Sequence, residues 1–192
     1  MKKNLKFLYI LSSVLFILSC AATPPTKFYT LAGTADSVKP IDSRKILIGI
    51  DVVFVAGYIE RPQIITYRDN TQVEMSEFNR WAEALTYSVQ RVVAENVSNY
   101  FKNGMAKPAT TGRSGYTYIV QIELNKLDGR FGDMAQLDAW WTITGQDRQM
   151  LAREHTYLKT PVGDSYNDLV EKQSWLIGEL SSKIAHRISK LK

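Results

Sequence analysis

The sequence predicts a single α+β domain in which two long helices pack on one face of a mixed, mostly antiparallel sheet. Apolar and polar residues alternate over 45–55 and 135–143, as they do in strands that bury one face. Over 78–100 and 169–191 the apolar residues recur at helical spacing instead. Three predicted strands precede each helix, so the expected order is βββα followed by βββα.

The first half of the domain is expected to contain three strands and then a long amphipathic helix. The strands are predicted over residues 27–32, 45–55 and 62–68, with a return strand over 71–75. Asp69 and Asn70 are turn-forming residues that would join the last two strands. Ser76 is a suitable N-cap for the helix, and Gly104 ends the helical pattern.

The second half repeats this arrangement after a loop over 107–115 that is rich in Gly, Pro and Thr. Three strands are predicted over residues 118–124, 135–143 and 149–159, paired as an antiparallel meander. Gly145, Gln146 and Asp147 form the turn between the last two strands. Ser165 and Asp168 have the spacing of a capping box, which predicts the start of the second helix.

The first twenty residues have the layout of a bacterial lipoprotein signal peptide. Lys2, Lys3 and Lys6 form a positively charged region before the apolar run 7–18. This run is too short to cross about 30 Å of hydrocarbon as a helix, so it is expected to be removed. Residues 17–20 resemble the lipobox at which lipoprotein signal peptides are cut. The alternative is an ordinary secretory signal followed by an incidental cysteine.

Cys20 is the only cysteine in the chain, and we expect it to be acylated after cleavage. By similarity to the lipoprotein sorting rule of Gram-negative bacteria, Ala21 at the next position directs the protein to the periplasmic face of the outer membrane. The expected organisation is a signal peptide over 1–19, the acylated cysteine and a tether with Pro24-Pro25 over 20–26, and a periplasmic domain over 27–192.

Composition and motifs argue against nucleic-acid binding and against catalysis. Removal of residues 1–19 leaves 21 of the 24 Lys and Arg residues against 19 Asp and Glu, a net charge of about +2 with no basic block. The two histidines, His155 and His186, have no metal-ligand spacing, and no nucleophile or phosphate-loop motif is present. Asp128 is expected, like the other carboxylates of its region, at the surface. No enzyme activity, cofactor or metal is therefore predicted.

Three stretches resemble the ABC-type transport auxiliary lipoprotein family. They are Tyr58–Arg68, Arg80–Leu85 and Gln90–Asn96, whose family pattern is an acidic-Arg-Pro-Gln strand followed by Arg-Trp-Ala-Glu-Pro-Leu at a helix start. Glu60 occupies the acidic position, and Ala84 stands where proline is usual. The resemblance continues to the closing helix and so covers essentially the whole mature chain.

This resemblance implies a function that the periodicity alone does not. Members of the family are periplasmic accessory subunits that work with an inner-membrane MCE-domain protein in lipid movement between the membranes and in envelope integrity. Because MCE assemblies are rings, a matching homo-oligomeric ring of this subunit is consistent with the resemblance. Two other functions are compatible with the sequence: a lipid carrier with its own apolar cavity of roughly 300 Å³ or more, and an envelope-scaffolding lipoprotein without a transport role.

The candidate partner-binding residues are Glu60, Arg61, Arg80, Glu83 and Trp140. Pro62 lacks a backbone N–H and belongs at a strand start, which would place Glu60 and Arg61 at a strand edge or loop mouth. The pair could equally have a structural role, and Arg80 and Glu83 could clamp the preceding strand.

The two adjacent tryptophans of the meander are expected to face opposite sides of the sheet. Trp141 continues the apolar face, so Trp140 would either be exposed at an interface or be covered by a local loop. Trp81 lies on the apolar side of its element and is predicted to be a core residue.

Overall fold

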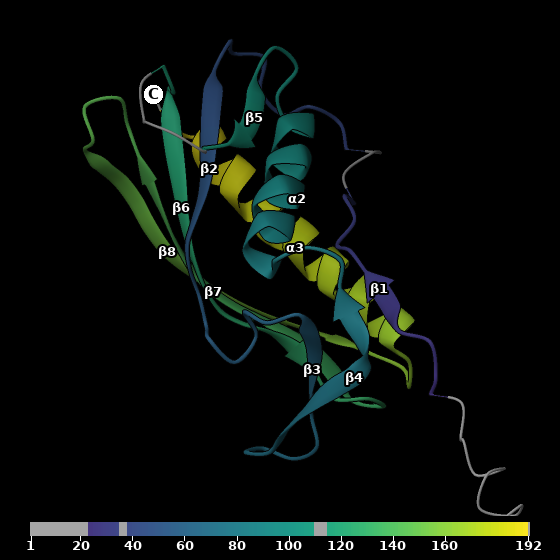
Figure 1. Cartoon of the computed structure of the whole chain (residues 1–192). Coiled ribbons are helices and arrows are strands. Elements are labelled where there is room, and N and C mark those ends of the chain that lie inside the picture. Colours follow the sequence, from purple (N-terminus) through teal and green to yellow (C-terminus); the bar gives the residue numbers. More distant parts are fainter. Residues whose placement is uncertain (1–22, 35–37, 110–114, 192) are drawn as a thin grey trace, which may run out of the picture.

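A five-stranded sheet, with two helices on one of its faces, forms the main body of the molecule (Figure 1). The computed structural model describes residues 23–34, 38–109 and 115–191. Its strands are β1 (Lys27–Tyr29), β2 (Leu47–Val55), β3 (Gln63–Tyr67), β4 (Val73–Trp81), β5 (Met105–Pro108), β6 (Tyr118–Gly129), β7 (Met134–Thr144) and β8 (Met150–Pro161), and its helices are α2 (Leu85–Asn99) and α3 (Tyr166–Ser189). The predicted α+β class is confirmed. Cys20 and the predicted signal peptide lie outside the described residues.

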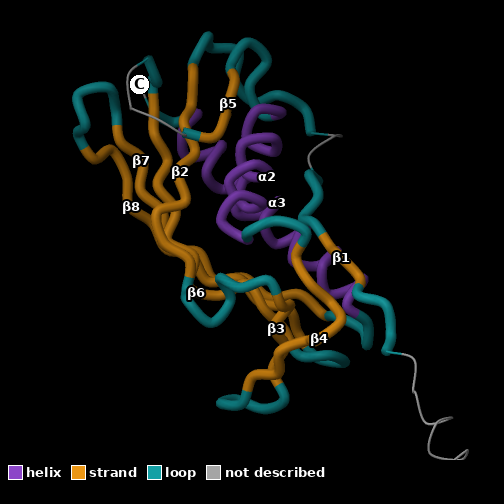
Figure 2. Tube along the Cα trace, in the orientation of Figure 1, coloured by secondary structure: helices purple, strands orange, loops and turns teal. Residues whose placement is uncertain are grey.

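The strands form two sheets. The larger has the order β5-β2-β6-β7-β8, in which β2 is parallel to both β5 and β6 and the predicted meander β6-β7-β8 is antiparallel. The smaller has the order β1-β4-β3, with the hairpin β3-β4 antiparallel and β1 parallel to β4. Figure 2 shows the smaller sheet beside one end of the larger one, next to the start of α3.

The helices bury their apolar faces against the inner face of the larger sheet and against each other. Two buried glutamine side chains join the helices to this sheet. Gln90 Nε2 of α2 donates to the Ile50 carbonyl at 2.7 Å, and Gln173 Nε2 of α3 donates to the Leu127 carbonyl at 3.0 Å. Neither described helix is long and apolar enough to cross a bilayer.

The second helix starts as predicted. The Ser165 hydroxyl accepts a hydrogen bond from the Asp168 backbone N–H at 3.1 Å. The Asp168 carboxylate accepts from the Gly163 backbone N–H rather than from the N-cap residue itself. The two residues therefore fix the turn before α3 as well as its first N–H groups.

The predicted start of the first helix is wrong. Residues 76–81, which were assigned to the helix, belong to β4, and α2 begins only at Leu85. The N-cap residue is Ala84, whose side chain offers no hydrogen bond, and Ser76 lies inside a strand. Strand β4 forms because β1 pairs with it on one side and β3 on the other.

The described residues form eight strands, four before each helix, where the predicted order has three. The additional strands are β4, of which only the beginning was predicted as a return strand over 71–75, and β5, which overlaps the predicted loop over 107–115 at residues 107 and 108. Pro108 is tolerated there because β5 is at the edge of the sheet and, among the described strands, pairs only with β2.

Candidate docking site

The loop between β2 and β3 carries the first part of the family motif. Its backbone is closed by hydrogen bonds from the Ile59 and Glu60 N–H groups to the Ala56 carbonyl, at 2.9 and 3.1 Å. The Ile59 side chain is buried in the core, so the two charged residues that follow are held at the surface edge of the loop. The loop is therefore a fixed turn.

The end of β4 brings the second part of the motif to the same place. The Trp81 backbone N–H donates to the Pro62 carbonyl at 2.7 Å, so β4 pairs with the chain just where β3 begins. As predicted, Pro62 lies at a strand start, where its missing N–H is not needed. A surface pocket of about 340 Å³ results, which we call the motif pocket; it is lined by Glu60, Arg61, Pro62, Trp81, Ala82, Glu83 and Ala84.

Three of the five predicted partner-binding residues, Glu60, Arg61 and Glu83, thus line one pocket. Arg80 is the neighbouring residue of β4 and is not part of the lining. Trp140 lies on β7, in the other sheet.

Arg61 is the exposed cation of the motif pocket. Its Nη1 lies 3.1 Å from the Met75 sulfur and its Nη2 donates to the Gly57 carbonyl at 3.3 Å. Both partners are neutral, and no carboxylate of the described residues lies within ion-pairing distance of Arg61. Its positive charge is therefore not neutralised by an ion pair within the described residues.

Two other charged groups at this site have incomplete hydrogen bonding. Among the described residues, no partner is found for Glu60 Oε2 or for Arg80 Nε, although both atoms are buried. An unsatisfied buried polar atom costs about 1–3 kcal/mol. Arg80 also pairs in register with Phe28 and Gln63 in the middle of the smaller sheet. The Arg80 side chain is partly exposed, so its predicted role as a contact residue stays a prediction.

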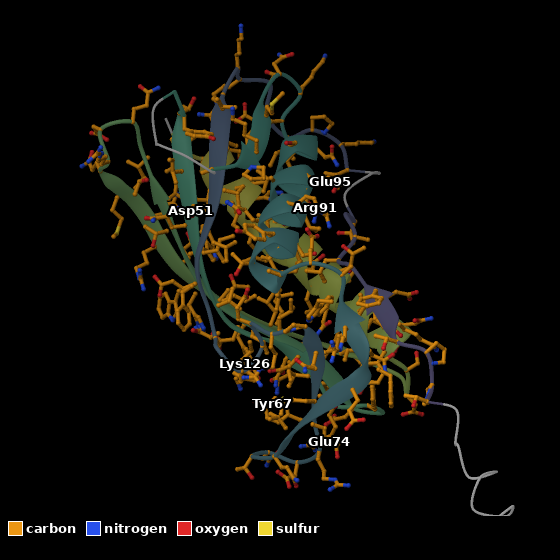
Figure 3. The ribbon with its side chains drawn as sticks, viewed as in Figure 1. Asp51, Tyr67, Glu74, Arg91, Glu95 and Lys126 are labelled. Atoms are coloured by element: carbon orange, nitrogen blue, oxygen red, sulfur yellow. The ribbon has the colours of Figure 1, made fainter. Side chains whose placement is uncertain are left out.

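Glu83 is held by an ion pair at the start of α2. Its Oε1 lies 2.9 Å from Nη2 of Arg91, which also donates to the Thr30 hydroxyl at 3.0 Å and the Leu31 carbonyl at 3.3 Å. Figure 3 labels Arg91 on α2 together with Glu95, one turn further along, whose carboxylate is 4.0 Å away. Glu83 thus helps to fix the segment after β1 against the helix, as well as lining the pocket.

A buried carboxyl group on β6 holds the loop between β2 and β3, which we call the motif loop. The Tyr58 hydroxyl donates to Asp128 Oδ2, and Gln136 Nε2 donates to Asp128 Oδ1 at 2.8 Å. Asp128 is fully buried, which contradicts the prediction that it lies at the surface. It is on the sheet face opposite the helices, where the loop covers it.

Burial raises the pKa of Asp128, although the hydrogen bonds from Tyr58 and Gln136 and the charge of Lys126 act to lower it. Burial also raises the pKa of Tyr58, and the adjacent carboxyl group raises it further. The phenol therefore remains a neutral donor. Sequence reasoning missed this pair, although Tyr58 opens the family motif.

Trp140 is 38% exposed, whereas Trp141 is 1% exposed, as the alternation predicts. The Trp140 side chain is partly covered by residues of strand β8 and not by a loop. The indole stacks on His155 at a centroid distance of 4.7 Å, and the Arg153 guanidinium lies 5.2 Å from the ring centroid. Phe54 of β2, half exposed, lies in the same cross-strand row on the far side of Glu123, so the exposed aromatic surface of the outer face consists of Phe54 and Trp140 with Glu123 between them.

The two histidines make ordinary structural contacts. His155 Nε2 is 3.2 Å from Asp138 Oδ1, and His186 Nδ1 is 2.8 Å from the Ser182 carbonyl. Within the described residues, no group of three His, Cys, Asp or Glu side chains is arranged to hold a metal ion.

The model of the ABC-type transport auxiliary lipoprotein component family matches residues 29–185 of this chain. The chain belongs to this family. The matched residues include both segments that line the motif pocket, 60–62 and 81–84, and nearly all of α3. The family consists of auxiliary components of transport systems, so the protein is a transport-related lipoprotein component. No curated protein sequence matches the chain significantly.

Two solved structures share the fold at low sequence identity, and a third is only a weaker match. An uncharacterized protein is 17% identical, with 86% of this chain and 100% of that chain covered and a TM-score of 0.73. Protein XCC0632 from Xanthomonas campestris, of the family DUF330, is 12% identical over 84% of this chain and 94% of its own, with a TM-score of 0.64. The PelC dodecamer from Paraburkholderia phytofirmans is 11% identical over 80% and 93%, with a TM-score of 0.42.

Proposed function

We propose that this protein is an outer-membrane-anchored, periplasmic accessory lipoprotein of an MCE-type intermembrane lipid transport system, and that it acts as a docking subunit without catalytic chemistry. Family membership supports the transport role. The acylated Cys20 would hold the domain at the membrane, and the tether with Pro24-Pro25 would space it from the lipid. The folded domain would then receive the periplasmic end of the MCE-domain protein.

The motif pocket is the observation that carries the docking role. Two motif segments about twenty residues apart in sequence meet there, and Arg61 presents a cation without an acidic partner in the described chain. A carboxylate of the MCE-domain protein would pair with this cation, while Pro62, Ala82 and Ala84 of the lining would provide apolar contact. Trp140 and its aromatic surface lie in the other sheet and would serve a second contact, between copies of this subunit in a ring.

We expect Arg61→Glu to weaken capture of the MCE-domain protein about tenfold while changing the melting temperature by no more than about 2 °C. The reason is that Arg61 is exposed and contacts only neutral groups, so reversal breaks no internal ion pair. Pull-down and thermal unfolding should be measured on the same preparation. Arg148→Glu, the same charge change in the exposed turn before β8, is the matched control. Equal capture by both variants would rule out Arg61 as a docking residue.

We expect Cys20→Ala to abolish membrane anchoring. Without the cysteine no acyl chain can be attached, and each buried CH₂ of such a chain contributes about 0.8 kcal/mol. Density-gradient fractionation should find the variant as a soluble or uncleaved precursor, while Ala21→Asp should move the protein to the inner membrane. Recovery of Cys20→Ala in the outer membrane would refute the lipid anchor.

A lipid-carrier function is the second candidate, and it can be tested by lipid binding to the same protein. It requires an apolar cavity between helices and sheet, whereas that space is occupied by fully buried side chains such as Val92, Ile122 and Ile177. A delipidated preparation should therefore fail to bind a fluorescent fatty acid. A scaffolding role without transport would be favoured if the gene lay apart from genes for MCE-domain and ABC components.

A further inference from the structure

A groove of about 390 Å³ lies between strand β8 and the C-terminal half of α3; we call it the β8 groove. It is lined by Glu154, His155, Thr156, Tyr157, Lys183, His186, Arg187 and Lys190. The four β8 residues are consecutive, so their side chains alternate between the two faces of the sheet. A groove that touches all four therefore follows the edge of the strand rather than either face.

This edge of the larger sheet is open. Strand β8 is 12 residues long and, among the described strands, pairs only with β7. Figures 1 and 2 show β8 as the outermost strand of the upper sheet. Every second residue of an edge strand turns its N–H and C=O groups away from its neighbour. The groove thus offers a row of backbone donors and acceptors to an extended segment.

The charge beside this edge is almost entirely positive. Lys183, Arg187 and Lys190 follow one another on one side of α3, at spacings of four and three residues. Glu154 is the only acidic residue of the lining, and it is already paired with Arg187 at 2.9 Å. Lys183 and Lys190 have no carboxylate of the described residues within 4.0 Å.

We call Lys183, Arg187 and Lys190 the basic stripe. A contact outside the groove holds the end of the helix that carries it. Arg44 donates to the Leu191 carbonyl at 2.6 Å and to the Ile188 carbonyl at 3.0 Å, at the end of α3. The guanidinium is itself fixed by the Asp42 carboxylate, whose pKa the Arg44 hydrogen bonds lower. The last turn of the helix, and with it Lys190, is therefore anchored to the segment before β2, while the Arg187–Glu154 ion pair joins this end of the helix to β8.

We propose that an extended, acidic segment of a partner protein adds to β8 as a further strand, with its acidic side chains beside Lys183 and Lys190. Backbone hydrogen bonds to β8 provide affinity, and the basic stripe selects for negative charge. This surface is separate from the motif pocket and does not depend on the docking role assigned there. A peptide is favoured over a flat anionic membrane because the open backbone groups lie in the same groove as the charges.

The test uses the mature lipoprotein in nanodiscs of zwitterionic lipid and a fluorescein-labelled ten-residue peptide of alternating Thr and Glu. Fluorescence anisotropy should show binding that weakens at least fivefold between 50 and 500 mM NaCl, because salt screens the charges. The double variant Lys183→Glu, Lys190→Glu should bind about tenfold more weakly than wild type. Lys172→Glu, the same change on α3 outside the groove, should bind within twofold of wild type. If the double reversal lowers the melting temperature, Lys183→Gln with Lys190→Gln replaces it, with a smaller loss expected.

Two further measurements distinguish strand addition from simple charge attraction. Hydrogen–deuterium exchange of β8 amides should slow when the peptide is bound, and the peptide N-methylated at alternate residues should give no protection and at least tenfold weaker binding. Equal binding of the N-methylated peptide, or absence of peptide binding, would overturn the proposal. So would phosphatidylglycerol vesicles that bind through the same lysines while the peptide does not.

Discussion

Trp81→Ala is expected to lower the free energy of unfolding by about 3–5 kcal/mol, the usual cost of emptying a buried aromatic site. The Trp81 side chain is 6% exposed and belongs to the core at the junction of the two sheets. Its removal would leave a cavity beneath the end of β4, which holds β1 and β3 in one sheet. Urea unfolding followed by circular dichroism measures the loss.

Trp140→Ala is the matched control, because the same atoms are removed from a residue that is 38% exposed. It loses the stack with His155 and the contact with Arg153, which together are worth about 1–2 kcal/mol. If the two variants lose equal stability, Trp81 is not the core residue that its burial indicates. The same variants test the outer aromatic surface. If Trp140→Ala weakens assembly of the subunit, while the folded fraction of Trp81→Ala assembles normally, this surface is an interface.

The sequence predicted those features of the fold that depend on burial alone. Strands β6 and β7 keep the predicted alternation over 118–124 and 135–143, and Trp141 is buried while Trp140 is not. Strand β2 keeps it only as far as Val52, because a register shift after that residue places Phe54, which the pattern assigned to the buried face, on the outer face. The helices were predictable because each needs a continuous apolar stripe to pack on the sheet. The capping residue Ser165 marked the start of α3 for the same local reason.

The start of the first helix could not be predicted because two local signals were misleading. Strand β4 contains an irregularity opposite the Gln63–Ile65 step, so its buried residues Ser76 and Trp81 are five apart instead of two or four. Phe78, Trp81 and Leu85 are three and four residues apart, which is helical spacing, although the first two belong to β4. The true N-cap, Ala84, has no capping side chain, whereas Ser76 is a good cap type in the wrong place.

Only part of the candidate site could be predicted, because the motif identifies residues but not the contacts between distant segments. Glu60, Arg61 and Glu83 were recognised from motif spacing, and the β3-β4 hairpin brings them together. That Glu83 is held by Arg91, and that Arg80 pairs in the middle of a sheet, depends on contacts between distant segments. Asp128 was missed because the bulge at Asn125 and the covering loop, neither visible in the pattern, determine its burial.

The Asp128 carboxyl group gives the second large effect on stability, and the size of that effect depends on the substitution. Asp128→Ala leaves the Tyr58 hydroxyl and the Gln136 amide without their buried acceptor, which should cost about 2–4 kcal/mol for the two groups together. Asp128→Asn should cost little at neutral pH. Its amide oxygen can accept from Tyr58, and its N–H can donate to Gln136 once that side chain amide is flipped.

The pH dependence of these variants tests the raised pKa of Asp128 directly. An acid whose pKa is higher in the folded state binds its proton more tightly there, so its contribution to stability is full below the unfolded value, about 3.9. The contribution is lost as the pH rises through the folded value. Because Asn does not titrate, the stability of Asp128→Asn relative to wild type should increase from pH 4 to pH 8. Urea unfolding at each pH gives this difference, in which the other titrating groups cancel. A difference that stays constant or falls over this range would show that hydrogen bonding outweighs burial, and that the motif loop rests on a carboxylate that is stable when charged.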